Sequence, residues 1–253
     1  MPESPVHDPI RLEGLVALVT GAGGGIGGRA ARLLAERGAV VAVADRDPAV
    51  LEQAVADAAS SVHQLDLVDV DAPTRLLVEV LERHQRLDLL VNSAGINARS
   101  AAAETSPEEW ARVMEVNLAG TYRMMQAAHP ALRVSEHAAV VSLTSTAAAV
   151  AVPHNAAYST SKAGLVHLTR VLASEWAADG IRLNTVAPTI VATAMTEAVR
   201  QDPAYMADKL ASIPLGRMAT VDDVAQAIAF LASPAAAMVT GQTLFVDGGV
   251  TTR

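Results

Sequence analysis

The chain of 253 residues contains no cysteine, and this absence excludes a disulfide framework, a thiolate nucleophile and a thiolate metal site. Aromatic residues are also scarce, at 3% of the chain, and only two lysines accompany seventeen arginines. Acidic residues outnumber basic ones, 27 against 19, so the net charge is −8. Because nucleic acid requires a basic face, it is not a predicted partner. A chain without cysteine suits the cytoplasm, which is the expected location.

The sequence also lacks a long apolar run. Its longest apolar stretch, residues 138–152, is interrupted by hydroxyl side chains and closed by Pro153, so it is too short and too polar to span a membrane. The N-terminal segment carries acids and prolines where a signal peptide has basic residues and an apolar run. We therefore expect a soluble protein without a membrane partner, with a flexible arm over residues 1–11 and a single domain over residues 12–253.

Short β-rich runs alternate with helical segments along the chain. The runs predicted as strands are Leu15–Thr20, Ala39–Ala44, Ser61–Leu65, Leu87–Val91, Ala138–Leu143, Ile181–Val186 and Thr243–Val246. Most are continuously apolar, as expected of strands with both sheet faces covered. The alternation predicts right-handed crossovers and an α/β fold: one doubly wound parallel sheet of about seven strands, with helices on both faces.

Two helix starts are predicted from capping residues. Ser106-Pro-Glu-Glu109 combines an N-cap serine, a proline at the first helical position and a glutamate placed for a capping box. Thr220-Val-Asp-Asp223 offers a weaker version of the same pattern. We expect a helix to begin at each position.

A glycine cluster follows the first predicted strand directly. Gly23, Gly25 and Gly28 fit the pattern G-x-G-x-x-G. Gly21, Gly25 and Gly27 fit G-x-x-x-G-x-G, which we favour because Gly21 immediately follows the strand. Such a turn lets the backbone approach a pyrophosphate at the N-terminus of the next helix. The predicted dinucleotide-binding turn consists of Gly21, Gly24, Gly25, Ile26 and Gly27.

Asp45 closes the second predicted strand, twenty-four residues after Gly21. Its carboxylate can accept hydrogen bonds from an adenosine ribose and would repel a 2′-phosphate, so it favours NAD over NADP. Arg46 could instead contact a 2′-phosphate, although the glycine turn carries no basic residue to assist it. Asp66, after the third predicted strand, is a candidate acceptor for the adenine amino group; a solvated loop acid is the alternative.

Tyr158 and Lys162 are four residues apart, which on a helix places a phenol and an ammonium on one face. A nearby positive charge favours the ionised phenol, so Tyr158 is a candidate proton donor and acceptor. Tyr205 and Lys209 have the same spacing, and context must decide between the pairs. Thirteen residues before Tyr158 stands Ser145, at the end of an apolar run, whereas the equivalent position before Tyr205 is an alanine. We therefore assign the chemistry to the first pair.

With Asn92-Ser-Ala-Gly95, Asn117 and Pro188 added in this order, the chain resembles the short-chain dehydrogenase/reductase family over about residues 12–250. The resemblance implies a Rossmann-like sheet, a nicotinamide cofactor and usually a homotetramer. It also implies that residues 12–253 form a single NAD-binding catalytic domain, with a mobile lid over residues 189–214.

By match of motif, Tyr158 looks like the catalytic acid/base, and Ser145 like the residue that orients and polarises the substrate oxygen. Lys162 looks like the group that binds the nicotinamide ribose and lowers the pKa of the tyrosine. Asn117 resembles the residue that holds a water leading from that lysine toward solvent. The resemblance also implies cofactor contacts from Leu67, Asn92, Ser93, Ala94, Gly95, Tyr158, Lys162, Pro188, Val191 and Thr193.

Two positions depart from the family pattern. Ser93 stands where the family usually has asparagine, and Thr189 stands where a glycine commonly follows the proline. A β-branched residue disfavours the positive φ open to glycine and adds bulk near the nicotinamide. The candidate substrate contacts are Ser145, Asn155, Tyr158 and Thr189.

The leading functional hypothesis is an NAD(H)-dependent enzyme that interconverts a small neutral secondary alcohol and a ketone. One alternative is an NADPH-dependent 3-oxoacyl thioester reductase, which would need Arg46 to outweigh Asp45. A second alternative is a dinucleotide-binding regulator without turnover, which would leave Ser145, Tyr158 and Lys162 as coincidence. None of these hypotheses calls for a metal ion.

Overall fold

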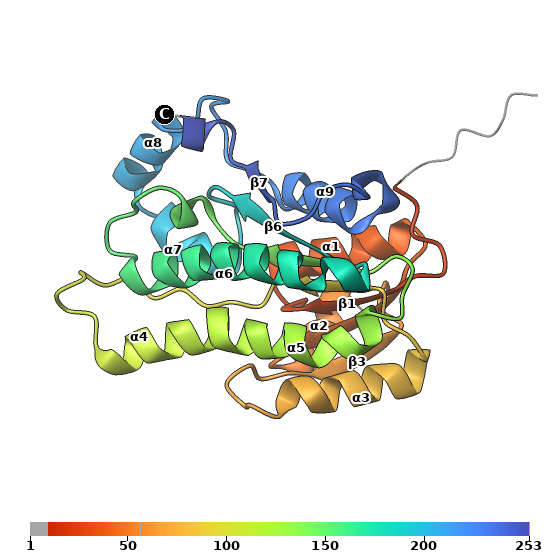
Figure 1. Cartoon of the computed structure of the whole chain (residues 1–253). Helices are drawn as coiled ribbons and strands as arrows, with labels where there is room; N and C mark the ends of the chain where they lie inside the picture. Colours follow the sequence, from red (N-terminus) through yellow and green to blue (C-terminus); the bar gives the residue numbers. More distant parts are fainter. Residues whose placement is uncertain (1–9, 56, 253) are drawn as a thin grey trace, which may run out of the picture.

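The computed structural model describes residues 10–55 and 57–252, so most of the predicted N-terminal arm lies outside the described residues (Figure 1). One sheet, with every neighbouring pair parallel, has the strand order β3-β2-β1-β4-β5-β6-β7. Its strands are β1 (Val16–Thr20), β2 (Val40–Asp45), β3 (Ser61–Gln64), β4 (Leu89–Asn92), β5 (Ala139–Leu143), β6 (Arg182–Pro188) and β7 (Thr243–Val246). All seven predicted runs are confirmed, with ends that differ by at most two residues.

Helices cover both faces of the sheet, as predicted. They are α1 (Gly25–Glu36), α2 (Pro48–Val55), α3 (Ala72–His84), α4 (Pro107–Met114), α5 (Thr121–Leu132), α6 (Ala156–Glu175), α7 (Glu197–Arg200), α8 (Pro203–Ala211) and α9 (Val221–Ala232). A π-helical turn, Glu115–Gly120, joins α4 to α5, and Figure 1 shows the two as one continuous rod beside α6. Within the described ranges, none of these helices combines the length and apolar character needed to cross a membrane.

The two faces of the sheet carry separate hydrophobic clusters. In β1, Ala17 and Val19 belong to the cluster that includes α1 and α9. Leu18, between them, belongs to the cluster that includes α3, α5 and α6. Because successive side chains of a strand point to opposite faces, both positions must be apolar. This explains why the strands are continuously apolar in sequence.

Both predicted helix starts are present, but the capping box forms at Thr220 and not at Ser106. Ser106 accepts from the backbone N–H of Glu109 at 3.1 Å, as predicted for an N-cap. The carboxylate of Glu109 accepts a bond from Ser100 Oγ at 2.6 Å. At the start of α9, Thr220 and Asp223 form the reciprocal pair that defines a capping box. The prediction that the Thr220 version would be the weaker one was therefore wrong, because a tertiary partner engages Glu109.

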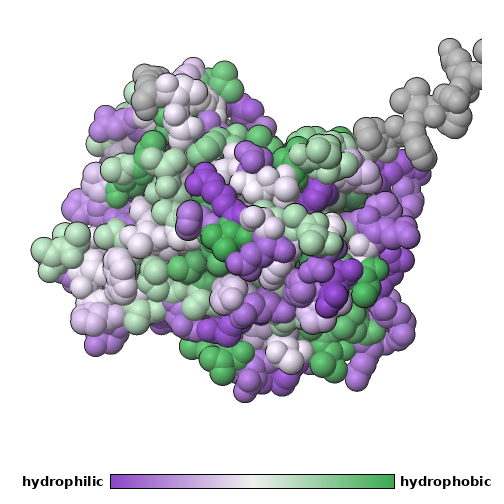
Figure 2. All heavy atoms as spheres, viewed as in Figure 1, coloured by the Kyte–Doolittle hydropathy of each residue, from purple (hydrophilic) through white to green (hydrophobic). Residues whose placement is uncertain are grey.

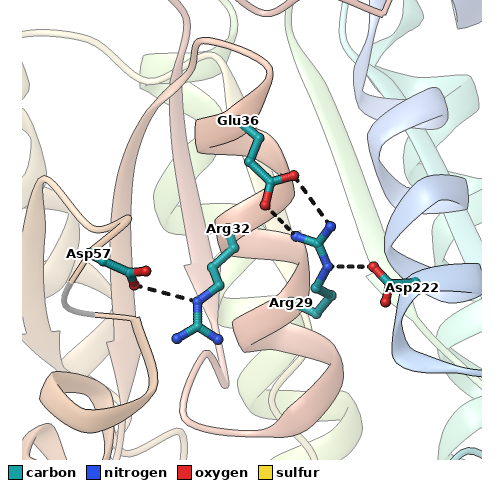
Figure 3. Close-up of polar contacts among 5 residues, drawn as sticks. All are labelled: Arg29, Arg32, Glu36, Asp57 and Asp222. Carbon is teal, nitrogen blue, oxygen red and sulfur yellow. Dashed lines mark hydrogen bonds and ion pairs between the residues drawn. The ribbon is translucent and has the colours of Figure 1, made fainter.

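The start of α9 is held against α1 by a charged cluster (Figure 3). Arg29 on α1 bonds to Glu36 of its own helix at 2.8 Å and to Asp222 of α9. Arg32, one turn further along α1, contacts Asp57 at 3.5 Å. These pairs are largely solvent-exposed, so they orient the helices and add little stability. On the face seen in Figure 2, polar and apolar residues are interspersed.

The sheet order places β1 between β2 and β4. The chain first builds β2 and β3 on one side of β1 and then crosses to build β4, β5, β6 and β7 on the other side. In open parallel sheets, ligands bind in the crevice outside the carboxyl ends of the strands at such a switch point. The glycine turn follows β1 and the segment from Ser93 follows β4. The fold therefore brings these two segments together at one edge of the sheet.

Candidate active site

A cavity of about 880 Å³ lies at the carboxyl ends of the strands. It extends from the glycine turn to the first turn of α6 and the segment after β6. The predicted site residues that line it are Gly21, Gly24, Gly25, Ile26, Gly27, Asp45, Arg46, Asp66, Leu67, Ser93, Ala94, Gly95, Ser145, Asn155, Tyr158, Lys162, Pro188, Thr189, Val191 and Thr193. Residues distant in the sequence are thus gathered around one space large enough for a cofactor and a substrate.

The glycine turn is shaped for close approach. Gly21 has a φ of +69°, and a Cβ there would lie 2.5 Å from the backbone nitrogen of Ala94. A Cβ on Gly27 would collide with the carbonyl oxygen of Gly21. These constraints support the G-x-x-x-G-x-G interpretation. Gly24 is the N-cap of α1 and has no side chain to cap it, so the first-turn amides are left to a ligand.

The acidic residue at the end of β2 is fixed beside this turn. Asp45 Oδ2 accepts from the N–H of Gly23 at 3.1 Å, and its Oδ1 accepts from the N–H of Arg46 at 2.7 Å. A negative charge therefore stands where an adenosine ribose would meet the glycine turn. Asp66 is exposed, and its Oδ1 accepts from the N–H of Val68 at 3.0 Å.

Two asparagines of the predicted site, Asn92 and Asn117, are not among the residues that line the cavity. Asn92 is buried and donates to Ser142 Oγ at 3.2 Å, which ties β4 to β5. Asn117, in the π-helical turn, exchanges bonds of 2.8 and 2.9 Å with the backbone of Ile96 and donates to Ser161 Oγ at 3.1 Å. Asn117 therefore holds the segment after β4 against α6. Its role in holding a water remains a prediction.

Tyr158 is half-buried in the first turn of α6, and Ser145 follows β5. Burial raises the pKa of the Tyr158 phenol, and a hydrogen bond with Ser145 opposes this rise. The resemblance implies a pKa lowered by Lys162. This effect remains a prediction, because burial and the Ser145 bond are the causes of the shift in this structure.

Lys162 lies one helical turn after Tyr158. Its Nζ is 5.7 Å from the centroid of the Tyr158 ring and donates to the carbonyl oxygen of Leu143 at 2.9 Å. Burial lowers the pKa of this lysine to about 8. Gly95 leaves the space that the ammonium needs, because a Cβ there would lie 3.3 Å from Nζ.

The segment predicted as a lid contains α7 and α8 and closes one side of the cavity. The carbonyl oxygen of Thr193 accepts from Thr196 Oγ1 at 3.1 Å and from Arg200 at 3.3 Å. A Cβ on Gly25 would lie 3.1 Å from Thr193 Cγ2, so this segment abuts the glycine turn. Movement of the lid remains a prediction.

The second tyrosine–lysine pair also lines the cavity, from α8 in the lid. Arg99 donates to Tyr205 Oη at 3.3 Å and lies over its ring at 5.1 Å. Tyr205 therefore links the lid to the segment after β4. The structure thus separates the two pairs, since Tyr158 has a side-chain hydrogen bond with Ser145, whereas Tyr205 Oη accepts from Arg99.

The two departures from the family pattern are accommodated. Ser93 Oγ would lie 3.0 Å from a Cβ at Gly27, so the small side chain packs against the glycine turn. Thr189 is not among the described non-glycine residues with positive φ, so no backbone strain arises there. The concern that a glycine conformation is required was therefore unfounded.

Sequence reasoning missed Asn97, which lines the cavity after β4. Its Oδ1 is buried and has no hydrogen-bond partner within the described residues. Its place two residues after Gly95, at the carboxyl end of a predicted strand, was the signal that could have identified it.

Comparison with known proteins agrees with this geometry. Residues 21–251 match the family model described as Enoyl-(Acyl carrier protein) reductase. A D-threitol dehydrogenase of Mycolicibacterium smegmatis is 38% identical over 256 residues, covering 99% of this chain and 98% of the relative. A 3-oxoacyl-(acyl-carrier-protein) reductase of Thermotoga maritima is 35% identical over 246 residues, covering 95% of this chain and 99% of the relative.

Solved structures show the same similarity. A putative short-chain alcohol dehydrogenase from Sinorhizobium meliloti has a TM-score of 0.92 at 35% identity, covering 96% of this chain and 99% of that one. A gluconate 5-dehydrogenase from Burkholderia cenocepacia, in complex with NADP and tartrate, has a TM-score of 0.92 at 33% identity, covering 97% and 98%. This chain belongs to the short-chain dehydrogenase/reductase family and is an oxidoreductase with a site for a nicotinamide dinucleotide.

Proposed function

We propose that this protein interconverts a secondary alcohol and a ketone, with NAD(H) as the preferred hydride carrier. The observation that carries the proposal is the placement of Ser145, Tyr158 and Lys162 in the same cavity as the glycine turn and Asp45. When bound, the nicotinamide supplies or accepts the hydride, and the protein must manage the proton and the charge on the substrate oxygen.

Tyr158 and Ser145 would act together on that oxygen. For alcohol oxidation, the Tyr158 phenolate takes the hydroxyl proton while the Ser145 hydroxyl donates a hydrogen bond to the oxygen. For ketone reduction, the phenol returns the proton. The Lys162 ammonium and the positive N-terminal end of α6 both favour the phenolate, against the desolvation that raises its pKa. The hydrogen bond from Lys162 Nζ to the carbonyl oxygen of Leu143 fixes the position of the ammonium beside the Tyr158 ring.

The experiment that tests this proposal is a panel of secondary alcohols incubated with NAD⁺ while nicotinamide absorbance is followed. Turnover of at least one alcohol is the expected result. Tight NAD⁺ binding without turnover across the panel would favour the dinucleotide-binding regulator.

Asp45→Ala should narrow the preference for NADH over NADPH, because it removes the charge that would repel a 2′-phosphate. We expect the ratio of the two kcat/KM values to change by roughly tenfold or more, equivalent to about 1.4 kcal/mol. Asp66→Ala is the matched control, since Asp66 also lines the cavity but its carboxylate accepts from Val68, whereas Asp45 accepts from Gly23. A wild-type enzyme that already prefers NADPH would contradict the NAD assignment and favour the 3-oxoacyl thioester reductase, an activity that one relative's name carries.

We further propose a homotetramer with β7 at a two-fold interface. β7 is an edge strand that pairs with β6, and Phe245 on it is 38% exposed. An apolar edge is a risk for aggregation, and pairing with a second copy would cover it. Light scattering should therefore give the mass of a tetramer, and removal of residues 244–253 should give dissociated or insoluble protein. A stable, active monomer of the whole chain would contradict this arrangement.

A further inference from the structure

Some of the buried polar atoms that lack partners belong to the wall of the cavity. Asn97 Oδ1, Asn155 Oδ1 and Thr189 Oγ1 all belong to residues that line it. Each is buried and, among the residues that the structure describes, has no hydrogen-bond partner. Buried polar atoms are nearly always paired, since leaving one unpaired costs free energy. The cavity therefore holds hydrogen-bonding capacity that the protein does not use on itself.

Asn155 shows most clearly that this capacity is directed at a ligand. It is the N-cap of α6, where an asparagine side chain ordinarily accepts from the second or third helical N–H. Here the third helical residue is Tyr158, and the Asn155 side chain makes no capping bond. The residue is only 6% exposed, so water does not replace that bond freely. The helix thus gives up its cap while the amide lines the cavity.

The backbone before Asn155 is also unusual. His154 has a φ of +61°, one of two described non-glycine residues with positive φ. Such a conformation is uncommon for residues other than glycine, although histidine adopts it more often than most. It sets the direction in which the chain enters α6. The chain thus enters α6 with the Asn155 side chain beside the candidate acid/base and without a capping bond.

Thr189 supplies a second group from a different element. It follows β6 and is 7% exposed, and its N–H donates to the carbonyl oxygen of Val246 at 3.2 Å. Its φ lies in the range that any residue adopts, so the threonine is not needed to shape the backbone. Its hydroxyl therefore remains for a ligand in the cavity.

A substrate with a single hydroxyl would not use these groups. In the proposed reaction, Ser145 and Tyr158 already engage the reacting oxygen. Neutral amides and hydroxyls, which both donate and accept, match further hydroxyl groups on the substrate. An unbranched apolar chain would leave all three atoms unpaired. A long acyl chain therefore fits this wall poorly.

We infer that the substrate is a polyhydroxylated carbon chain, and that Asn155 and Thr189 bind the hydroxyls next to the reacting carbon, with Asn97 completing the set. This inference rests on the proposed function for the position of the reacting oxygen. The same hydroxyl chemistry occurs in an alditol and in an aldonate. Arg99 and Lys209 also line the cavity, so a terminal carboxylate has cations within the same space.

The test measures kcat/KM for tetritols, pentitols and hexitols, for the corresponding aldonates, and for secondary monoalcohols of equal carbon number. The wild type should prefer one of the polyhydroxylated series. Asn155→Ala and Thr189→Val should each lower the ratio of polyol to monoalcohol kcat/KM by roughly tenfold, the effect of one lost hydrogen bond. Thr220→Ala, which removes a genuine helix cap far from these groups in sequence, should leave the ratio unchanged. An equal loss for both substrate types, or a wild-type preference for the monoalcohol, would overturn the inference.

Two further measurements do not depend on turnover. Thr220→Ala should lower the melting temperature by about 2–4 °C, whereas Asn155→Ala should not, because its amide does not cap α6. An equal fall for both variants would make Asn155 a structural cap and overturn the inference.

Calorimetric titration of threitol and of threonate into the enzyme–NAD⁺ complex separates the two sources of hydroxyls. If the wild type binds threitol or threonate, Asn155→Ala abolishes that binding and no alcohol is turned over, the proposed function is wrong but hydroxyl recognition is supported. If there is neither binding nor turnover, both the proposed function and the inference are overturned.

Discussion

Tyr158→Phe is expected to lower kcat by roughly a hundredfold to ten-thousandfold, the range that a positioned acid or base contributes. The change removes one hydroxyl, so the ring keeps its place in the first turn of α6 and the fold should persist. Affinity for NAD⁺ should remain close to that of the wild type, because the glycine turn and Asp45 are untouched. Steady-state kinetics together with NAD⁺ titration by fluorescence measure the two quantities separately.

Tyr205→Phe is the matched control, since Tyr205 has the same spacing to a lysine and lines the same cavity. It loses only the hydrogen bond from Arg99, so we expect a change in substrate KM and little change in kcat. If both variants lost kcat to the same extent, the assignment of the first pair as the catalytic one would be wrong.

Lys162→Met should abolish most activity and weaken NAD⁺ binding, yet raise the free energy of unfolding at neutral pH. The folded protein lowers the pKa of Lys162 from 10.5 to about 8, so charging this lysine costs the fold on the order of 3 kcal/mol at pH 7. The lost bond to Leu143 offsets about 1 kcal/mol of this gain. A net gain of about 2 kcal/mol is therefore expected, measured by urea unfolding.

The pH dependence of that gain has a definite sign. Below about pH 8 the lysine is charged in both states, and the wild type bears the whole cost of burying the charge. Between about pH 8 and 10.5 the unfolded chain binds more protons than the folded one, so wild-type stability rises with pH and the advantage of Lys162→Met disappears. Lys209→Met, in the lid, serves as the control. A less stable Lys162→Met protein at pH 7 would contradict the predicted cost.

The apolar strands of the core and the glycine turn of the site follow from local sequence patterns, so both could be predicted. β1 is apolar from Val16 to Val19 because Val19 and Leu18 face different helix layers, and this pattern indicated a doubly covered parallel sheet. The glycine turn could be placed because Gly21 follows a strand directly and Gly25 and Gly27 follow it at the start of a helix. In both examples, one constraint acts on neighbouring residues of the chain.

A prediction that failed depended on a partner distant in the sequence. Glu109 looked like a capping-box residue, but Ser100, which the fold brings against it, engages its carboxylate. The net direction of the Tyr158 pKa shift also depends on burial, which raises the pKa and is a property of the whole cavity. Neither burial nor a tertiary partner can be read from the spacing of two residues.

The sequence by itself determined the fold class, the order of the strands along the chain and the identity of the Ser145, Tyr158 and Lys162 set, because each follows from periodicity or short-range spacing. Only the tertiary structure decided which polar side chains remain unpaired among the described residues. Asn155 has the sequence of an ordinary helix cap, and its free amide becomes apparent only when burial and hydrogen bonds are known. The reason is physical: cavities and unmet hydrogen bonds arise where several elements converge, and no single segment contains them.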